Sequence, residues 1–198
     1  MNLPLHVHKK AIRSLGISES FVKKSGQHSI LAGIVMRTDR IIDGFTISTA
    51  TVGGMDATIK VIEMYNALKR DDINLLMING CVISWYNVID LHKVSKETGL
   101  PLVCVTYEES DGLEKYFMEL FPNDYEARIE IYHKNKRRQP LTLRNGYTVY
   151  IRCVMMNLEE AKGILHKFTL QGAVPEPIRV ARLLARSIYK STMPTVVT

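Results

Sequence analysis

The sequence contains neither a long apolar run nor the continuous apolar core of a signal peptide. Its first ten residues, MNLPLHVHKK, are interrupted by proline, histidine and lysine. No later segment approaches the roughly 20 apolar residues that a membrane-spanning helix needs. We therefore expect a cytoplasmic protein with no membrane partner.

Cysteine is also scarce, with three residues in 198. Cys81, Cys104 and Cys153 lie in separate apolar runs, and none has the Cys-x-x-Cys or Cys/His spacing of a zinc site. We expect buried thiols in a reducing compartment, where disulfides are uncommon. The six histidines show no ligand spacing with other metal-binding residues, and none is a persuasive general base.

No internal repeat, low-complexity tract or linker-like stretch divides the chain. Its length suffices to bury a sizeable core without a metal or a disulfide, so we expect a single domain over residues 1–198. The net charge of +6 is compatible with a polyanionic partner, since clustered Lys and Arg bind phosphate backbones. The alternative is a charge that serves only solubility.

Runs rich in Ile, Val and Thr predict three strands at the start of the chain, the second and third joined as a hairpin. Helices and short buried strands then alternate. The predicted strands are 12–17, 29–37, 40–52, 74–78 and 100–106; the predicted helices are 57–69, 87–98, 111–120, 125–134, 158–170 and 177–190; and 141–154 is either a hairpin or one long strand. This order favours an α/β fold with a ribonuclease-H-like mixed sheet flanked by helices, because a Rossmann fold would place a helix after its first strand.

Six short motifs carry a resemblance to a known family. They are LGIS before Glu19, IIDGF at 41–45, GGMDAT at 53–58, INGC at 78–81, NVID at 87–90 and VPEPIRVA at 174–181. Together they cover most of the chain, and the GMDAT and PEPIRVA segments are the most specific. The sequence resembles the archaeal endonuclease dU family, which looks related to endonuclease V.

The resemblance implies a metal-dependent DNA endonuclease that is directed to deoxyuridine and acts in DNA repair. It also implies carboxylates at strand ends and at a helix start, which hold Mg²⁺ or Mn²⁺ beside the scissile phosphate. Two such cations activate water and stabilise the leaving oxygen. They need several converging carboxylates, because Mg²⁺ prefers oxygen ligands.

The sequence departs from the family pattern at these carboxylates. The family's first strand typically ends in Gly-Ile-Asp-Asp, whereas this chain has Ser18 and Glu19 at the two acidic positions. The family's later Leu-Asp-Gly and Asp-Gly-x-Asp-Ala-Thr elements have Asn79 and Gly53 in place of an acid, while Asp56 is kept. We therefore expect weak metal affinity and weakened or lost hydrolysis, with catalytic and metal roles, if retained, falling to Glu19 and Asp56.

Each residue of this former site also has a structural interpretation. Asp56 is either a metal ligand or the N-cap of the predicted helix 57–69. Glu19 is either a displaced ligand or a solvated residue at a strand end. Asn79 either belongs to the site or closes a turn with Gly80. Trp85 and Tyr86 either stack on an extruded base or pack beneath the loop, and packing is the more common role of aromatic side chains.

Two groups of basic residues are candidates for nucleic-acid binding. The first forms a stripe at helical spacing, beside an apolar stripe, on the last predicted helix; the second lies in a predicted loop. The stripe consists of Arg179, Arg182, Arg186 and Lys190, and the loop group includes Lys134, Lys136, Arg137 and Arg138. The alternative for both is an ordinary solvated surface.

Three hypotheses follow. The first is a DNA-binding protein, or alternatively an RNA-binding one, of the endonuclease dU type with weakened or lost catalysis. The second is an active endonuclease with a rearranged metal site that uses Glu19 and Asp56, helped by Asp43 or Asp90. The third is a non-catalytic module that binds a protein partner through its basic face.

Overall fold

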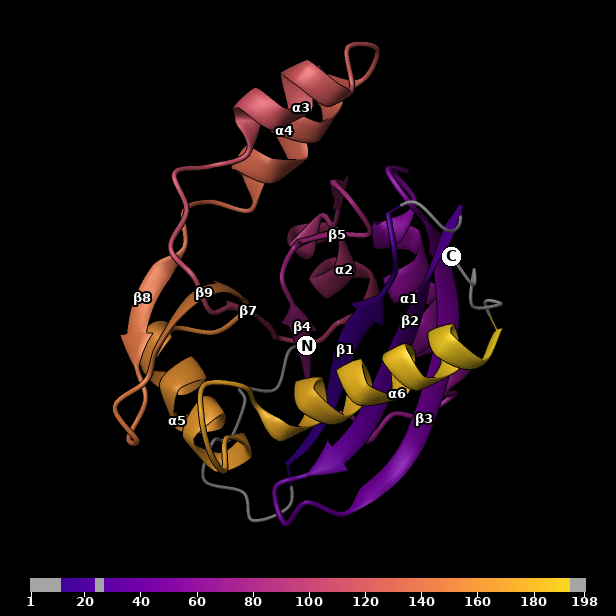
Figure 1. Cartoon of the computed structure of the whole chain (residues 1–198). Coiled ribbons are helices and arrows are strands. Elements are labelled where there is room, and N and C mark those ends of the chain that lie inside the picture. The colour runs from indigo at the N-terminus through magenta and orange to yellow at the C-terminus, as the bar shows by residue number, and fades with distance from the viewer. Residues whose placement is uncertain (1–11, 24–26, 193–198) are drawn as a thin grey trace.

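The computed structural model describes residues 12–23 and 27–192, and its centre is a seven-stranded sheet in the order β3-β2-β1-β4-β7-β9-β8 (Figure 1). The strands of this sheet are β1 (Arg13–Ser20), β2 (His28–Arg37), β3 (Ile42–Thr51), β4 (Leu75–Asn79), β7 (Leu102–Thr106), β8 (Gln139–Thr142) and β9 (Thr148–Val154). A small separate ribbon pairs β5 (Val82–Ile83) with β6 (Asn87–Val88). The helices are α1 (Ala57–Ala67), α2 (Leu91–Thr98), α3 (Glu114–Leu120), α4 (Tyr125–Lys134), α5 (Leu158–Phe168) and α6 (Glu176–Thr192).

The strand directions confirm the predicted ribonuclease-H-like mixed sheet. Strands β1, β2 and β3 are antiparallel neighbours, whereas β4 is parallel to β1, and β7 is parallel to β4. Strand β9 then runs antiparallel to both β7 and β8. The central strands β4 and β7 are buried along almost their whole length, which explains why they read as short continuous apolar runs in the sequence.

Helices cover both faces of the sheet. Helices α1 and α2 pack on one face through a core cluster that includes Leu76 and Val94. Helices α5 and α6 pack on the other face, where the cluster includes Met77, Leu165 and Ala181. Figure 1 shows α6 crossing in front of β1 and β2, while α1 and α2 lie behind the sheet. Within the described ranges, no helix has the length and apolar character required to traverse a bilayer.

The close approach of α6 to β1 depends on Gly16. A Cβ atom at this position would overlap the side chain and backbone of Pro177, in the first turn of α6. A glycine lets the helix lie directly on the middle of the strand, two residues before Ser18. The two family motifs that contain Gly16 and Pro177 are therefore in contact.

Several predicted boundaries were wrong. The helix expected from residue 87 begins at Leu91, because Asn87 and Val88 form strand β6 and Asp90 provides the N-cap. The helix expected from residue 111 begins at Glu114. The ambiguous segment 141–154 is a hairpin, in which β8 and β9 flank a turn that contains Gly146. The α3–α4 pair stands away from the sheet, above the β5–β6 ribbon (Figure 1).

Candidate functional site

Strands β1 and β4 bring Ser18 and Asn79 together at the carboxyl end of the sheet. The parallel register pairs Ile17 with Ile78, so the next residue of each strand lies at the same edge. The Asn79 side-chain amide donates a hydrogen bond of 3.1 Å to the Ser18 hydroxyl. Asn79 is thus the last residue of β4 and bonds across the sheet. The two central strand ends are linked by neutral groups.

Glu19 does not join Ser18 and Asn79 in one cluster. Successive residues of a strand point to opposite faces, so Glu19 is directed away from the Ser18–Asn79 pair. Its two oxygens accept hydrogen bonds from the Ser84 backbone N–H at 2.8 and 2.7 Å, and one also accepts from the Ser84 hydroxyl at 2.6 Å. Burial raises the pKa of Glu19, and the bonds from Ser84 offset only part of that effect. The interpretation as a solvated strand-end residue was wrong.

Asp56 is saturated by neighbouring donors. It accepts hydrogen bonds from the Thr51 N–H at 3.1 Å, the Thr51 hydroxyl at 2.9 Å and the Asn87 side-chain amide at 2.6 Å. Burial by itself would raise the pKa of Asp56, but the bonds from Asn87 and Thr51 hold it below its ordinary value. These donors fix the carboxylate in its charged form without a metal.

Asp56 occupies the N-cap position of α1, as predicted, but it does not act as a side-chain cap. Its side chain makes no capping hydrogen bond. The N–H of Ala57 instead donates to the Asn87 side-chain oxygen at 3.0 Å, so a residue from the β5–β6 ribbon caps the helix. Asn87 therefore joins the start of α1 to Asp56, and sequence spacing gave no indication of this contact.

A buried arginine that the sequence analysis missed holds the loop after β3. The Arg128 guanidinium donates to the carbonyls of Gly53 at 2.8 Å, Gly54 at 3.0 Å and Tyr86 at 2.8 Å. It also forms an ion pair of 2.7 Å with Asp124, one helical turn earlier. A positive charge therefore lies directly beside Gly53. The i, i+4 spacing of Asp124 and Arg128 was the one signal in the sequence, and it did not indicate burial.

The segment Ser84–Trp85–Tyr86 connects these groups in an unusual backbone conformation. All three residues have positive φ angles, of 45°, 55° and 70°, which non-glycine residues rarely adopt. The Glu19 carboxylate and Arg128 hold the segment, and the Ser84 carbonyl accepts from the Gly53 N–H at 2.7 Å. The strain is thus compensated by the polar groups that surround the segment.

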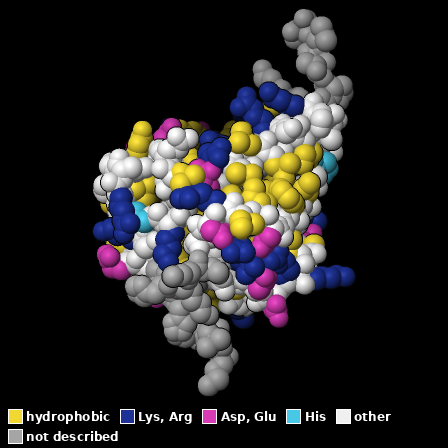
Figure 2. All heavy atoms as spheres, turned by 90° about the horizontal axis from the view of Figure 1, so that it is seen from below, with side chains coloured by type: hydrophobic (Ala, Val, Ile, Leu, Met, Phe, Trp, Pro, Cys, Tyr) yellow, Lys and Arg dark blue, Asp and Glu magenta, His cyan; other side chains and the backbone are white. Residues whose placement is uncertain are grey.

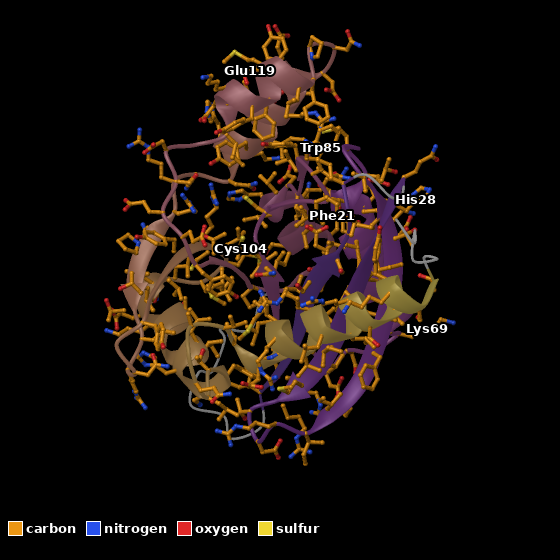
Figure 3. All side chains as sticks on the ribbon, in the orientation of Figure 1. Phe21, His28, Lys69, Trp85, Cys104 and Glu119 are labelled. Carbon is orange, nitrogen blue, oxygen red and sulfur yellow. The ribbon has the colours of Figure 1, made fainter. Side chains whose placement is uncertain are left out.

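Trp85 and Tyr86 pack against aromatic side chains of the α3 segment. Figure 3 shows Trp85 just below the α3–α4 pair. The Trp85 ring lies 5.5 Å from Phe121, and the Tyr86 ring lies 5.8 Å from Phe117. The Lys23 ammonium group lies 4.7 Å from the centre of the Trp85 ring. These contacts favour the packing role over that of a free stacking platform, although both side chains remain only half-buried.

Two other acids considered from the sequence lie outside the strand-end site. Asp43 forms ion pairs with Arg13 at 2.8 Å and Arg70 at 3.0 Å near the start of β3. Because β3 rises about 3.3 Å per residue, Asp43 lies roughly 26 Å along the strand from Thr51, the partner of Asp56. Acidic and basic side chains mix on this lower surface (Figure 2). Asp90 caps α2 and pairs with Lys134 at 2.6 Å.

The basic stripe of α6 is exposed, but its members are not equivalent. Arg179 is neutralised by the buried Glu176 at 2.5 Å. Arg182, Arg186 and Lys190 are exposed and form no ion pair with another described residue. Burial raises the pKa of Tyr107, and the charge of Arg182 counteracts part of that rise. Arg182 is therefore close enough to act electrostatically on the residue that follows β7.

The basic residues before β8 also differ from one another. Lys134 ends α4, and its ion pair with Asp90 takes it out of the predicted loop. Arg138 donates to the Thr106 hydroxyl and to the carbonyls of residues 108 and 110, so it fastens the segment after β7. Arg137 is exposed.

Of the predicted thiols, Cys81 and Cys104 are buried and Cys153 is half-buried, and all three are free.

The donor set at the strand ends does not fit a divalent cation. Ser18 and Asn79 are neutral and bonded to each other, while the oxygens of Glu19 and Asp56 are occupied by donors. In the part of the chain that the structure describes, no three His, Cys, Asp or Glu residues are grouped as a metal site requires. Removing carboxylates leaves little to compensate the charge of a hard cation.

Comparisons with a family model and with curated proteins find relatives that match most of this chain. The family model described as endonuclease dU matches residues 10–189. A UPF0215 protein from Pyrobaculum calidifontis is 35% identical over 175 residues, covering 88% of this chain and 95% of the relative. A UPF0215 protein from Methanosarcina mazei is 31% identical over 195 residues, covering 95% of each chain.

Solved structures share the fold. A protein of unknown function from Archaeoglobus fulgidus superposes with a TM-score of 0.77 at 26% identity, over 90% of this chain and 99% of that one. Endonuclease V from Ciona intestinalis, in complex with a DNA that contains an inosine followed by a ribo-adenosine, gives 0.62 at 11% identity, over 92% and 87% of the two chains. Human endonuclease V gives 0.60 at 17% identity, over 91% and 85%. At these identities, the two endonuclease V matches show the fold alone.

Proposed function

Because the chain belongs to the endonuclease dU family, we propose that it is a nucleic-acid-binding protein whose strand-end site no longer supports phosphodiester hydrolysis. The family resembles metal-dependent DNA endonucleases directed to deoxyuridine. The observation that carries the proposal is the hydrogen bond between Asn79 and Ser18. It occupies the strand ends where a nuclease of this fold requires charged ligands.

The surroundings of the two remaining acids, Glu19 and Asp56, also argue against hydrolysis. Glu19 faces the opposite side of β1, and each of its oxygens is occupied by Ser84. Asp56 is held by Thr51 and Asn87. Recruiting either carboxylate to a metal would break several short hydrogen bonds in a partly buried setting, at about 1–3 kcal/mol for each group left without a partner.

The exposed cations of α6 support the retained binding. Arg182, Arg186 and Lys190 follow one side of the helix, and Arg182 lies near the strand ends. Cations without acidic partners gain free energy from phosphate contacts through the release of counterions. The protein would then hold a DNA strand across the carboxyl edge of the sheet without cutting it. An RNA strand is the alternative ligand.

Catalysis is tested with labelled DNA carrying deoxyuridine or deoxyinosine, in the presence of Mg²⁺ or Mn²⁺. We expect no cleavage by the native chain and recovered cleavage in the double variant Ser18→Asp, Asn79→Asp. The matched control is Ser18→Asn alone, which has nearly the same shape as the double variant but no charge. Cleavage by the native chain that is lost in Asp56→Ala would instead show an active enzyme with a rearranged site.

Binding is tested by fluorescence anisotropy with labelled DNA and RNA between 50 and 200 mM salt. We expect affinity to fall steeply with salt, and the logarithmic slope to become shallower by about 2 in Arg182→Met, Arg186→Met. The matched control, Lys93→Met, Lys96→Met, removes the same charge from exposed positions of α2. Affinity that is absent, or unaffected by salt, would contradict the proposal and favour a protein partner.

A further inference from the structure

A cavity of about 640 Å³ lies between the α3–α4 pair and strands β8 and β9. Neither Ser18 nor Asn79 lines it, so it is separate from the strand-end site. Its volume falls within the range of small-molecule sites. The lining side chains that carry charge or an aromatic ring include Tyr132, Lys136, Arg137, Arg138, Tyr150 and Arg152.

Arg152 is the unusual member of this lining. It lies in the middle of β9, with a relative exposure of only 7%. Its Nε donates to the carbonyl of Lys136 at 2.8 Å, and its guanidinium lies over the Tyr132 ring at 5.2 Å. Among the described residues, no carboxylate forms an ion pair with it. Burying an unpaired charge costs several kcal/mol, so the cavity favours an anion beside this guanidinium.

The nearby cations add to this preference. Arg138 lies 5.5 Å from the centre of the Tyr150 ring, while Lys136 and Arg137 are exposed at the rim. Three acids also line the cavity, but Glu114 is bound to His133 at 2.9 Å. The other two, Glu109 and Asp111, are exposed to solvent, where their charges are screened. The deep part of the cavity is therefore positive.

Two thiols lie behind the guanidinium. Cys104 is the cross-strand partner of Arg152, below the α3–α4 pair (Figure 3). A hydrogen bond with Cys104, more than the charge of Arg152, lowers the pKa of Cys81, and the same bond raises the pKa of Cys104. A protonated thiol carries no charge, so mildly acidic solution keeps both thiols from acting as counter-charges to Arg152. We therefore choose pH 6 to measure anion binding.

We propose that this cavity binds a nucleotide, with its phosphate on Arg152 and its base against the tyrosines. The guanidinium offers paired donors that match phosphate oxygens, and aromatic rings at the wall suit a planar base. The nucleotide is either free or the terminal residue of a strand, since both present the same phosphate and base. The proposal does not depend on the fate of the strand-end site.

The test is calorimetry at pH 6 with thymidine monophosphate as the probe and thymidine as the ligand without phosphate. We expect binding of the monophosphate and none of the nucleoside. Arg152→Met should weaken binding at least tenfold, whereas Arg144→Met, which removes an exposed arginine from the β8–β9 turn, should leave it unchanged. Equal binding to the native chain and to Arg152→Met, or no binding to the native chain, would overturn the proposal.

Two further measurements keep this test decisive. Thermal unfolding without ligand reports whether Arg152→Met is folded, and if it is not, Arg138→Met provides the second variant, with the same expected loss. A short single-stranded DNA with a 5′-phosphate, compared with its 5′-hydroxyl counterpart, distinguishes the two sources of the nucleotide. Arg182→Met, Arg186→Met should weaken strand binding but not monophosphate binding, which separates this proposal from the function proposed above.

Discussion

Two buried arginines lie in two regions that differ in how well the protein compensates their positive charge. Arg128, beside the strand-end site, is 2% exposed and is surrounded by three carbonyls and a carboxylate. Arg152, in the cavity between α4 and β9, is 7% exposed and has one carbonyl and one aromatic ring as partners. Burial costs both charges their hydration, but protein groups satisfy only the first one.

The difference indicates where a ligand can still bind. Around Arg128 each polar group has a partner of the chain itself, including Glu19, Asp56 and Asn79, so an entering cation would have to displace existing bonds. Around Arg152 a positive charge remains uncompensated. The strand-end region thus has its polar groups satisfied from within the chain, whereas the buried charge of Arg152 leaves the cavity suited to an anion.

The largest expected effect is the difference in stability between the variants in which either arginine is replaced by methionine. Arg128→Met leaves buried carbonyls without donors and Asp124 without its partner, so we expect a loss of about 3–5 kcal/mol in the free energy of unfolding. Arg152→Met removes an unpaired buried charge, and we expect no loss, or a gain, in the same quantity. Urea unfolding of both variants measures this contrast, and an equal loss in the two would break it.

A smaller effect is expected at Asp56. Asp56→Asn replaces acceptors with a donor that faces Thr51 and Asn87, so we expect a loss of about 1–2 kcal/mol at pH 7. The folded-state pKa is lowered, so the stabilisation is present above the unfolded-state value of about 3.9 and is lost as the pH falls through the folded one.

Urea unfolding of Asp56→Asn from pH 2 to 7 should therefore show a difference from the native chain that shrinks in acid. The exposed Asp71→Asn serves as the matched control. A difference that is independent of pH would mean that the charge of Asp56 does not stabilise the loop.

The smallest effect is expected at Glu19, with the opposite dependence on pH. Its folded-state pKa is raised by burial, so its favourable contribution is present below the unfolded-state value of about 4.3 and is lost as the pH rises through the folded one. Glu19→Gln stays neutral, so its stability relative to the native chain should increase from pH 4 to 7, within about 1 kcal/mol. Unfolding across this range, with Glu97→Gln as an exposed control, checks the sign; a decrease would contradict the burial of a charged group.

The sequence predicted the fold because its signals were local. Strands β4 and β7 are the apolar runs that burial in a parallel sheet requires. The apolar stripe predicted for α6 is buried at Ile178, Ala181 and Ala185 and half-buried at Ile188, as the helical period indicates. The errors fell where a distant residue decided the local structure. Asn87 makes the capping hydrogen bond expected of Asp56, and Asn87 and Val88 form β6 where a helix was predicted.

The sequence by itself determined the order of the elements, the mixed sheet and the neutral residues Ser18 and Asn79 at two strand ends, because these depend on residue identity and short-range periodicity. Only the tertiary structure decided that Glu19 and Asp56 are saturated, since their donors Ser84, Thr51 and Asn87 are brought in by other segments. It also decided that Arg128 is compensated and Arg152 is not. The sequence gives the charge of each side chain, but the packing of segments that are distant in the sequence decides which groups neutralise or bind it.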